Sequence, residues 1–450
     1  MADLNVVHAE NPPAQTPLLN SNQNHIPPQE LRQQQQQRQN EETHLDQTLK
    51  KLEKFLTFLG FKQSSWRSSA LFWTAFVLIS VALPVVVLEL SDCSGCEMYQ
   101  IKAFELDIVA SQACLAAVSL LCISHNLRKY GIRKFLFVDR FNGQMSRFHD
   151  VYVKQILASL RLLVYWALPC VALKTAREVI RMLYVNHESW WQSVAILLAL
   201  IIPWTYLSLI SLSASVLFHM VCNLQVIHFD DYGKLLERES DVLVFMEEHI
   251  RLRYHLSKIS HRFRIYLLLG FFVVTASQFV TLLRTTAYSG IITIINGGHF
   301  AVSTIVQVVG IIICLHAATK ISHRAQGIAS LASRWHALLT CSSTDSLHNR
   351  VSNNVGNLEA AINLDSMEIN YSESDLDSSD YVPIPTNAQL ASYMSSYHKR
   401  QAFVTYLQTN PGGITIFGWT VDRALLNTLF FIELSLVTFL LGKTVVFNSN

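Results

Sequence analysis

Charged residues are scarce in this sequence. Asp, Glu, Lys and Arg make up 15% of its 450 residues, whereas soluble domains carry roughly a quarter. This scarcity argues against a soluble multidomain enzyme. The excess of basic residues is also small, with 35 Lys and Arg against 33 Asp and Glu, and no dense basic stripe is present. We therefore expect no binding to nucleic acid.

Motifs for catalysis and metal binding are missing as well. The sequence has no P-loop, no G-x-S-x-G and no H-E-x-x-H, and its histidines do not follow metal-ligand spacing. Eight cysteines in so long a chain do not make a disulfide scaffold. We expect no enzymatic activity, no cofactor and no metal. Cys93 and Cys96 share a short polar loop, where a disulfide between them and two free thiols both remain open.

Long apolar runs are what the sequence has in abundance, since 50% of the residues are hydrophobic. A helix needs roughly 20 residues to cross the bilayer core, and a backbone in lipid must satisfy its own hydrogen bonds. The runs are continuous rather than alternating, which predicts helices. We expect an all-α, polytopic protein with seven transmembrane helices in a lipid bilayer. The predicted spans are 69–90, 103–123, 156–176, 194–220, 265–286, 299–319 and 424–447.

The distribution of Lys and Arg predicts the orientation in the membrane. The segments before the first span and after the second, fourth and sixth spans are basic, whereas 91–100, 186–191 and 287–297 contain no Lys or Arg. Because basic segments stay on the cytosolic side, the N-terminus is predicted to be cytosolic and the C-terminus outside. Three basic residues that extend the third span towards the outer side are an exception to this pattern, Lys174, Arg177 and Arg181.

Four regions are expected along the chain. Residues 1–45 are predicted to be a disordered tail, because they are polar and contain a glutamine run. Residues 46–341 hold an amphipathic helix and the first six spans with cytosolic helix extensions. Residues 342–386, rich in Ser and acidic residues, are predicted to be a disordered cytosolic loop that could be phosphorylated. Residues 387–450 hold a cytosolic helix and the last span.

The amphipathic helix is predicted from five leucines at helical spacing, with lysines on the opposite side. Such a helix can lie on a membrane surface or can cap the underside of the helix bundle, and the sequence leaves both open. The five leucines are Leu45, Leu49, Leu52, Leu56 and Leu59.

Charged residues also occur in the outer part of the predicted bundle. Glu105 and Asp107 lie on the second span, and Lys174 and Arg177 on the third. Because charges are costly in a membrane, they are candidates for function. One interpretation is an outward-open vestibule that binds a polar ligand. The other is structural pairing, or side chains that extend to the interface.

The last span has a polar edge and one acidic residue, Glu433, near its middle. Copies of this helix around an axis could line a pore in which the carboxylate attracts cations and apolar side chains form the gate. Alternatively, Glu433 pairs with a polar group inside one subunit. The candidate pore-lining residues are Leu425, Thr428, Ile432, Glu433, Ser435, Leu436, Phe439 and Lys443.

The predicted topology and the stretch Gly418-Trp-Thr-Val-Asp422-Arg423-Ala-Leu425-Leu426 resemble the insect gustatory and odorant receptor superfamily. The chain looks like a plant member of this group, a gustatory receptor-like protein. The resemblance covers residues 45–447, without the 342–386 loop. The glutamine of the insect pattern in the last span is not present here.

The resemblance implies a homotetrameric, gated cation channel in which the last span of each subunit lines a central pore. It also implies a pocket for a small-molecule ligand in the outer half of each bundle, and residence in the plasma membrane, with endomembranes open. The ligand and the conducted ions are not indicated. Two other functions remain open: a non-conducting scaffold or signalling receptor, and a small-solute transporter.

Overall fold

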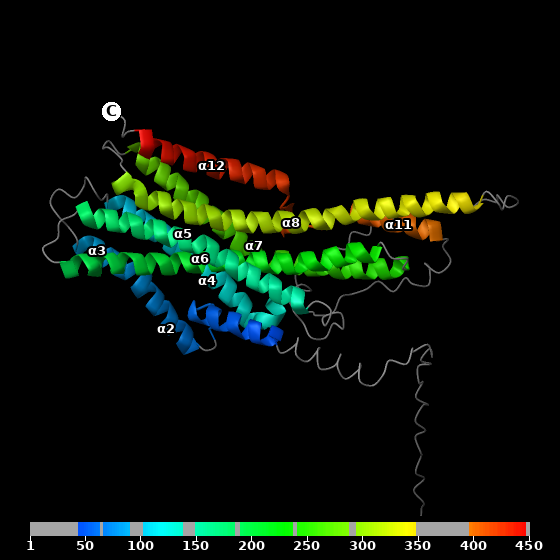
Figure 1. The fold of residues 1–450 in the computed structure, drawn as a ribbon, viewed down its shortest axis with the longest axis horizontal. Helices are drawn as coiled ribbons and strands as arrows, with labels where there is room; N and C mark the ends of the chain where they lie inside the picture. The colour runs from blue at the N-terminus through cyan, green and yellow to red at the C-terminus, as the bar shows by residue number, and fades with distance from the viewer. Residues whose placement is uncertain are drawn as a thin grey trace, which may run out of the picture.

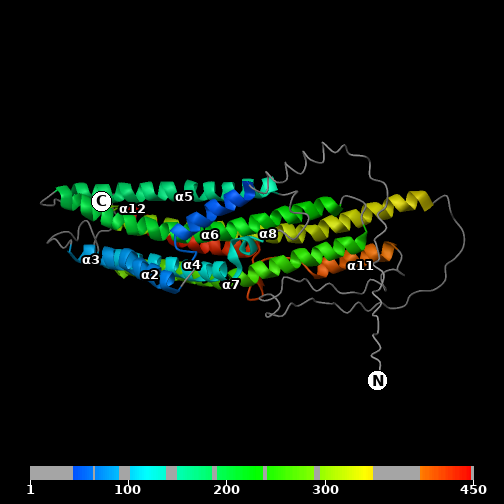
Figure 2. The same cartoon turned by 90° about the horizontal axis from the view of Figure 1, so that it is seen from below.

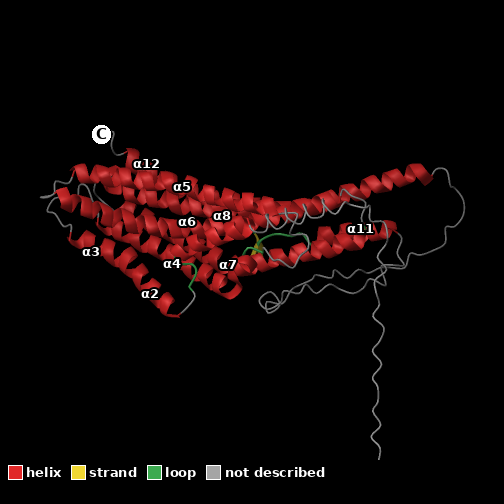
Figure 3. Cartoon of the chain, turned by 60° about the horizontal axis from the view of Figure 1, so that its bottom comes forward, coloured by secondary structure: helices red, strands yellow, loops and turns green. Residues whose placement is uncertain are grey.

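The computed structural model describes residues 44–63, 66–90, 102–137, 149–184, 190–236, 241–287, 294–347 and 396–446. These residues are almost entirely helical, apart from one short hairpin (Figure 3). The predicted tail over 1–45, apart from its last two residues, lies outside the described part of the chain. So does most of the predicted loop over 342–386.

Six helical stretches of the described chain are long and apolar enough to cross a membrane, and they match the first six predicted spans in order. The protein is therefore an all-helical integral membrane protein. The first stretch combines α2 (Trp66–Val77), the π-helix η1 (Leu78–Ala82) and α3 (Leu83–Leu90). The other five are α4 (Lys102–Phe135), α5 (His149–Tyr184), α6 (Trp190–Leu236), α7 (Val242–Ala287) and α8 (Ile294–Leu347).

The break in the first stretch has a local cause in Pro84. Proline has no backbone N–H, so it cannot bond the carbonyl of Ser80 four residues earlier. The chain forms the wider turns of η1 directly before this position, over Leu78–Ala82. A π-helical turn inside an α-helix accommodates such a lost hydrogen bond, so the span continues as one rod with a local irregularity.

Three helices are much longer than a membrane is thick. α6, α7 and α8 have 47, 46 and 54 residues, which at 1.5 Å per residue is about 70–80 Å, against roughly 30 Å of hydrocarbon. Their excess length projects together from one end of the bundle (Figure 1). There α11 (Ser396–Thr409) packs against α7 and α8.

The centre of the bundle is α6, which contacts α4, α5, α7 and α8 (Figure 2). α6 is apolar on all sides, as expected for a helix surrounded by others. Aromatic side chains link α6 to its neighbours, as where the rings of Phe218 and Phe263 meet edge to face with centroids 5.0 Å apart. This core positions the polar residues described below.

A helix over residues 44–58 precedes the first span and packs against the bundle. Its four leucines and Leu59 directly after it belong to the hydrophobic core and are at most 4% exposed, and Phe61 is fully buried. Asp46 forms an ion pair with Arg133 of α4, with 2.7 Å between Oδ1 and Nη2. Of the two interpretations left open by the sequence, the structure shows the cap on the bundle.

The turn after this helix requires glycine. Gly60 has φ +86°, and the ring of Phe72 occupies the space that a Cβ atom would need. The close approach of Phe72 holds the capping helix against the start of the first span.

The last helix is introduced by a small hairpin. β1 (Thr415–Ile416) pairs with β2 (Trp419–Thr420) in antiparallel fashion. The hydroxyls of Ser322 and Ser260 accept hydrogen bonds from the backbone N–H groups of Ile414 and Thr415, at 3.1 and 3.0 Å. The hairpin is thereby fixed to α8 and α7 directly before α12 (Arg423–Val446) begins.

Asp422 caps α12, because its Oδ1 accepts a hydrogen bond of 2.9 Å from the N–H of Leu425. We expect Asp422→Ala to lower the free energy of unfolding by about 1 kcal/mol, since a helix-terminal donor loses its acceptor. Asp422→Asn keeps an oxygen in place and is expected to stay close to wild type. Denaturant titration of the purified protein in detergent measures both, and equal losses in the two variants would contradict the capping role.

Candidate functional site

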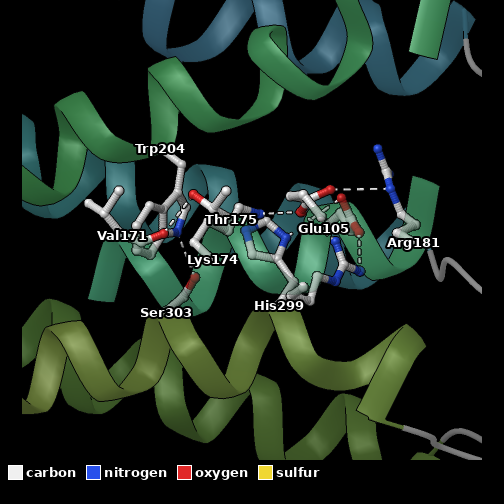
Figure 4. A network of polar contacts seen from close by, with 10 residues as sticks. Glu105, Val171, Lys174, Thr175, Arg181, Trp204, His299 and Ser303 are labelled. Atoms are coloured by element: carbon white, nitrogen blue, oxygen red, sulfur yellow. Dashed lines mark hydrogen bonds and ion pairs between the residues drawn. The ribbon is translucent and has the colours of Figure 1, made fainter. Parts of the chain in front are cut away.

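A cluster of buried charges (Figure 4) connects α4 and α5 near the end of the bundle that lies opposite α11 in Figure 1. Glu105 lies in the first turn of α4 and accepts a hydrogen bond of 2.8 Å from Nη2 of Arg177 on α5. Glu178 accepts hydrogen bonds of 2.6 Å from both Lys174 and Arg177. Nε of Arg181 lies 3.2 Å from the second oxygen of Glu178.

The helical repeat of α5 explains how these four neighbours meet. Lys174 lies three and four residues before Arg177 and Glu178, and Arg181 lies three and four residues after Glu178 and Arg177, so all four occupy one side of the helix. α5 continues to Tyr184, about two turns beyond the predicted end of the span, and carries all four of them into the bundle. Each side chain is at most 8% exposed.

Two further helices close the cluster. His299 of α8 has its Nδ1 3.6 Å from the Oε2 of Glu105. Trp204 of α6 donates a hydrogen bond of 3.0 Å from its indole nitrogen to Ser303 of α8. The ammonium group of Lys174 lies 5.9 Å from the centre of the Trp204 ring, within range of a cation–π contact. The cluster therefore joins α4, α5, α6 and α8.

Electrostatics make this cluster sensitive to any change in charge. Ions removed from water are stable only when paired and hydrogen-bonded, and the loss of one partner leaves an uncompensated charge. Glu178 is the central acceptor, since it contacts three cations. Within the described residues, Oε2 of Glu105, Oε2 of Glu178 and both ring nitrogens of His299 make no hydrogen bond. These atoms have hydrogen-bonding capacity that the described residues do not use.

Asp107 is separate from this cluster. Its carboxylate pairs with Arg284 at the end of α7, with 3.1 Å between Oδ2 and Nε. The two side chains are 30% and 52% exposed, so this pair lies at the rim.

The structure thus brings three of the four predicted vestibule residues together, Glu105, Lys174 and Arg177. Sequence reasoning did not assign Glu178, Arg181 and His299 to the same site. A signal was available for two of them, because Glu178 and Arg181 share the helix face of Lys174. The contact of His299 depends on how α8 packs against α4, which the sequence does not reveal.

α12 lies at the edge of the bundle and packs against α7 and α8. The predicted pore-lining residues divide between two faces. Thr428, Ile432, Ser435 and Phe439 are exposed, whereas Leu425, Glu433 and Leu436 are turned towards the bundle. Lys443 lies on α12, but its side chain is outside the described part.

Glu433 is only 3% exposed, and its Oε1 accepts a hydrogen bond of 3.0 Å from Thr275 of α7. Within this protomer the carboxylate therefore faces α7. An open groove runs between the two helices beside this contact. Its lining is apolar except for Thr275 and Ser435, and consists of Phe272, Thr275, Ala276, Phe279, Phe431, Ile432, Ser435 and Leu436.

Two further expectations from the sequence concern a disulfide and metal ions. Cys93 and Cys96, the possible disulfide, lie outside the described residues. Across the described ranges, no three His, Cys, Asp or Glu side chains lie close enough together to hold a metal ion.

Comparison with known proteins matches residues 47–432 to the family described as "Protein of unknown function (DUF3537)". The chain belongs to the DUF3537 family. The match runs from the capping helix to the middle of α12, so the buried charge cluster lies inside the DUF3537 region and Glu433 directly follows it.

No curated protein matches this DUF3537 protein. Among solved structures, it is similar to the insect olfactory receptor OR5 from Machilis hrabei in complex with eugenol. The two share 13% identity over 89% of this chain and 99% of the receptor chain, with a TM-score of 0.49.

Proposed function

We propose that this protein is a gated cation channel of four identical subunits, in which α12 of each subunit lines a central pore. The observation that carries the proposal is the position of α12. It is an outermost helix supported by α7 and α8, and most of its described residues are exposed on a single protomer.

The exposed face of α12 has the composition expected of a pore. Thr428, Ile432, Ser435 and Phe439 are spaced four, three and four residues apart and form one stripe, with hydroxyls alternating with bulky apolar groups. The hydroxyls of Thr428 and Ser435 bond the backbone oxygens of Ala424 and Phe431. Around an axis, Ile432 and Phe439 would form apolar rings, and such constrictions gate by dewetting.

The length of α12 and the distribution of charge support the remaining parts of the proposal. Its 24 residues extend about 36 Å, enough to cross the hydrocarbon core. With seven crossings and the basic segments inside, the chain would begin in the cytosol and end outside. The buried charge cluster would then lie towards the outside, where spare hydrogen-bonding groups of Glu105, Glu178 and His299 can bind a polar small molecule as the stimulus. We place the channel in the plasma membrane.

Cysteine cross-linking tests the arrangement of α12 without knowledge of the stimulus. In a tetramer with the stripe at the axis, Ser435→Cys brings four thiols together, and we expect copper-phenanthroline to give disulfide-linked dimers. Leu434→Cys, one residue earlier, points about 100° away and is the matched control. Cross-linking of the wild-type protein measures the background that its native cysteines contribute.

Recording from the purified protein in planar bilayers tests conduction. We expect cation currents that a positively charged thiol reagent blocks in Ser435→Cys but not in Leu434→Cys. Equal cross-linking of both variants, or a monomeric mass in native mass spectrometry, would rule out the central position of α12. A tetramer without current under any condition would favour a non-conducting receptor.

A further inference from the structure

Three polar side chains meet between α7 and α12 within otherwise apolar stretches. Glu433 is 3% exposed and Gln278 is fully buried. Thr275 donates its hydroxyl to Oε1 of Glu433. Because Thr275 and Gln278 are three residues apart, they occupy the same face of α7. The amide of Gln278 lies beside the same carboxylate.

This group leaves three buried polar atoms without a hydrogen-bond partner among the described residues. They are Oε2 of Glu433 and both amide atoms of Gln278. A buried polar group without a partner is costly, and a buried charge more so. Native proteins seldom leave such atoms unpaired, and the exceptions often mark an ion or water that belongs there.

The helices packed against Glu433 provide no positive charge. α7 has no Asp, Glu, Lys, Arg or His between Arg264 and Arg284, and α8 has none between His299 and His316. On α12 the nearest basic residues are Arg423 and Lys443, each ten positions away, or about 15 Å along the axis. The carboxylate at the centre of this interface therefore has no ion-pair partner on the helices that cover it.

We infer that Glu433, Gln278 and Thr275 form a binding site for one monovalent cation such as sodium. Carboxylate, amide carbonyl and hydroxyl oxygens are the ligands that hard cations prefer. One carboxylate supplies one negative charge, so a monovalent ion neutralises the site and a divalent ion does not. The groove between α7 and α12 passes beside the site, because Thr275 belongs both to its wall and to the site.

The site lies within one protomer and does not depend on the proposed pore. A bound cation would satisfy the free oxygens of Glu433 and Gln278 together, and so would hold α12 against α7. An empty site would leave the carboxylate uncompensated and weaken this contact. Occupancy of the site thus controls how firmly the outermost helix is attached to the bundle.

Direct binding of sodium tests the inference. The full-length protein is placed in nanodiscs of zwitterionic lipid, and radioactive sodium is titrated in a scintillation proximity assay at constant ionic strength with choline. We expect saturable binding of about one ion per chain in the wild type, and a loss of roughly tenfold or more in affinity for both Glu433→Gln and Gln278→Leu. Asp107→Asn removes a carboxylate of the rim pair and is expected to bind as the wild type does.

Thermal unfolding provides a second measurement on the same samples. Because a ligand stabilises the state that binds it, replacing choline by sodium is expected to raise the midpoint by about 5 °C in the wild type and by less than about 1 °C in Glu433→Gln. Wild-type binding by Glu433→Gln, or no saturable binding by the wild type, would overturn the inference. If the wild type shows no saturable sodium binding and Glu433→Gln is as stable as the wild type, Glu433 is protonated rather than paired with a cation. Sodium binding without any current would support the cation site and contradict only the proposed channel function.

Discussion

Replacing Glu178 with leucine is expected to destabilise the folded protein by about 3–5 kcal/mol, the usual effect of removing one partner from a buried ion cluster. Glu178 accepts hydrogen bonds from Lys174 and Arg177, and its other oxygen lies 3.2 Å from Arg181. Without it, three cations remain at the same buried place, with Glu105 as the remaining carboxylate of the cluster. Denaturant titration in detergent and the yield of monodisperse protein on size-exclusion chromatography measure the effect.

Asp107→Asn is the control for this prediction, because it breaks an ion pair of similar length at the rim. Its partner Arg284 is 52% exposed, so we expect a change of at most about 1 kcal/mol. The double variant Lys174→Met with Glu178→Leu removes a cation as well and is expected to regain part of the loss. A Glu178→Leu protein as stable as Asp107→Asn would show that the cluster contributes little to folding.

Leu56→Ala in the capping helix is expected to cost about 2–5 kcal/mol, since a buried leucine that is truncated leaves a cavity. Leu56 is 1% exposed and belongs to the core that also contains residues of α4, α6 and α7. Phe58, two residues later, is 78% exposed, and Phe58→Ala is expected to change stability by no more than about 0.5 kcal/mol. Tryptophan fluorescence during denaturant titration compares the two variants.

The comparison of Leu56 with Phe58 also separates the two roles that the sequence allows for this helix. A helix that rests on the membrane surface by its leucine face would lose lipid affinity on Leu56→Ala but not on Phe58→Ala, and neither substitution would have much effect on the stability of the bundle. Similar, small effects of Leu56→Ala and Phe58→Ala would therefore contradict the capping role.

The helices of this fold could be predicted from the sequence because the signal is local. An uninterrupted apolar run forms a helix in a membrane whatever its neighbours are, and the first six predicted spans all appear. The spans mark only the apolar part of each helix. α7 begins at Val242, 23 residues before the predicted span 265–286, in the region where the sequence indicates a cytosolic helix extension.

The partners of polar residues could not be predicted in the same way, because pairing depends on the rotation of each helix. Arg284 and Asp107 are 177 positions apart and meet only through the packing of α7 and α4. Glu433 illustrates the same limit: its apolar neighbours on α12 lie on every side, so the sequence does not reveal that it faces Thr275. The leucines of the capping helix would be buried both on a membrane surface and against the helix bundle. Only the tertiary contacts distinguish these two positions.

α8 carries His299 and Ser303 at one end and Trp335 towards the other. The ring of Trp335 meets that of Phe245 with centroids 5.5 Å apart. The 36 residues between His299 and Trp335 correspond to about 54 Å of continuous helix. A rigid helix of this length would magnify a small rotation at one end into a larger displacement at the other. If it pivots by about 5° at the charge cluster, the distant indole sweeps through roughly 5 Å, close to one helical turn.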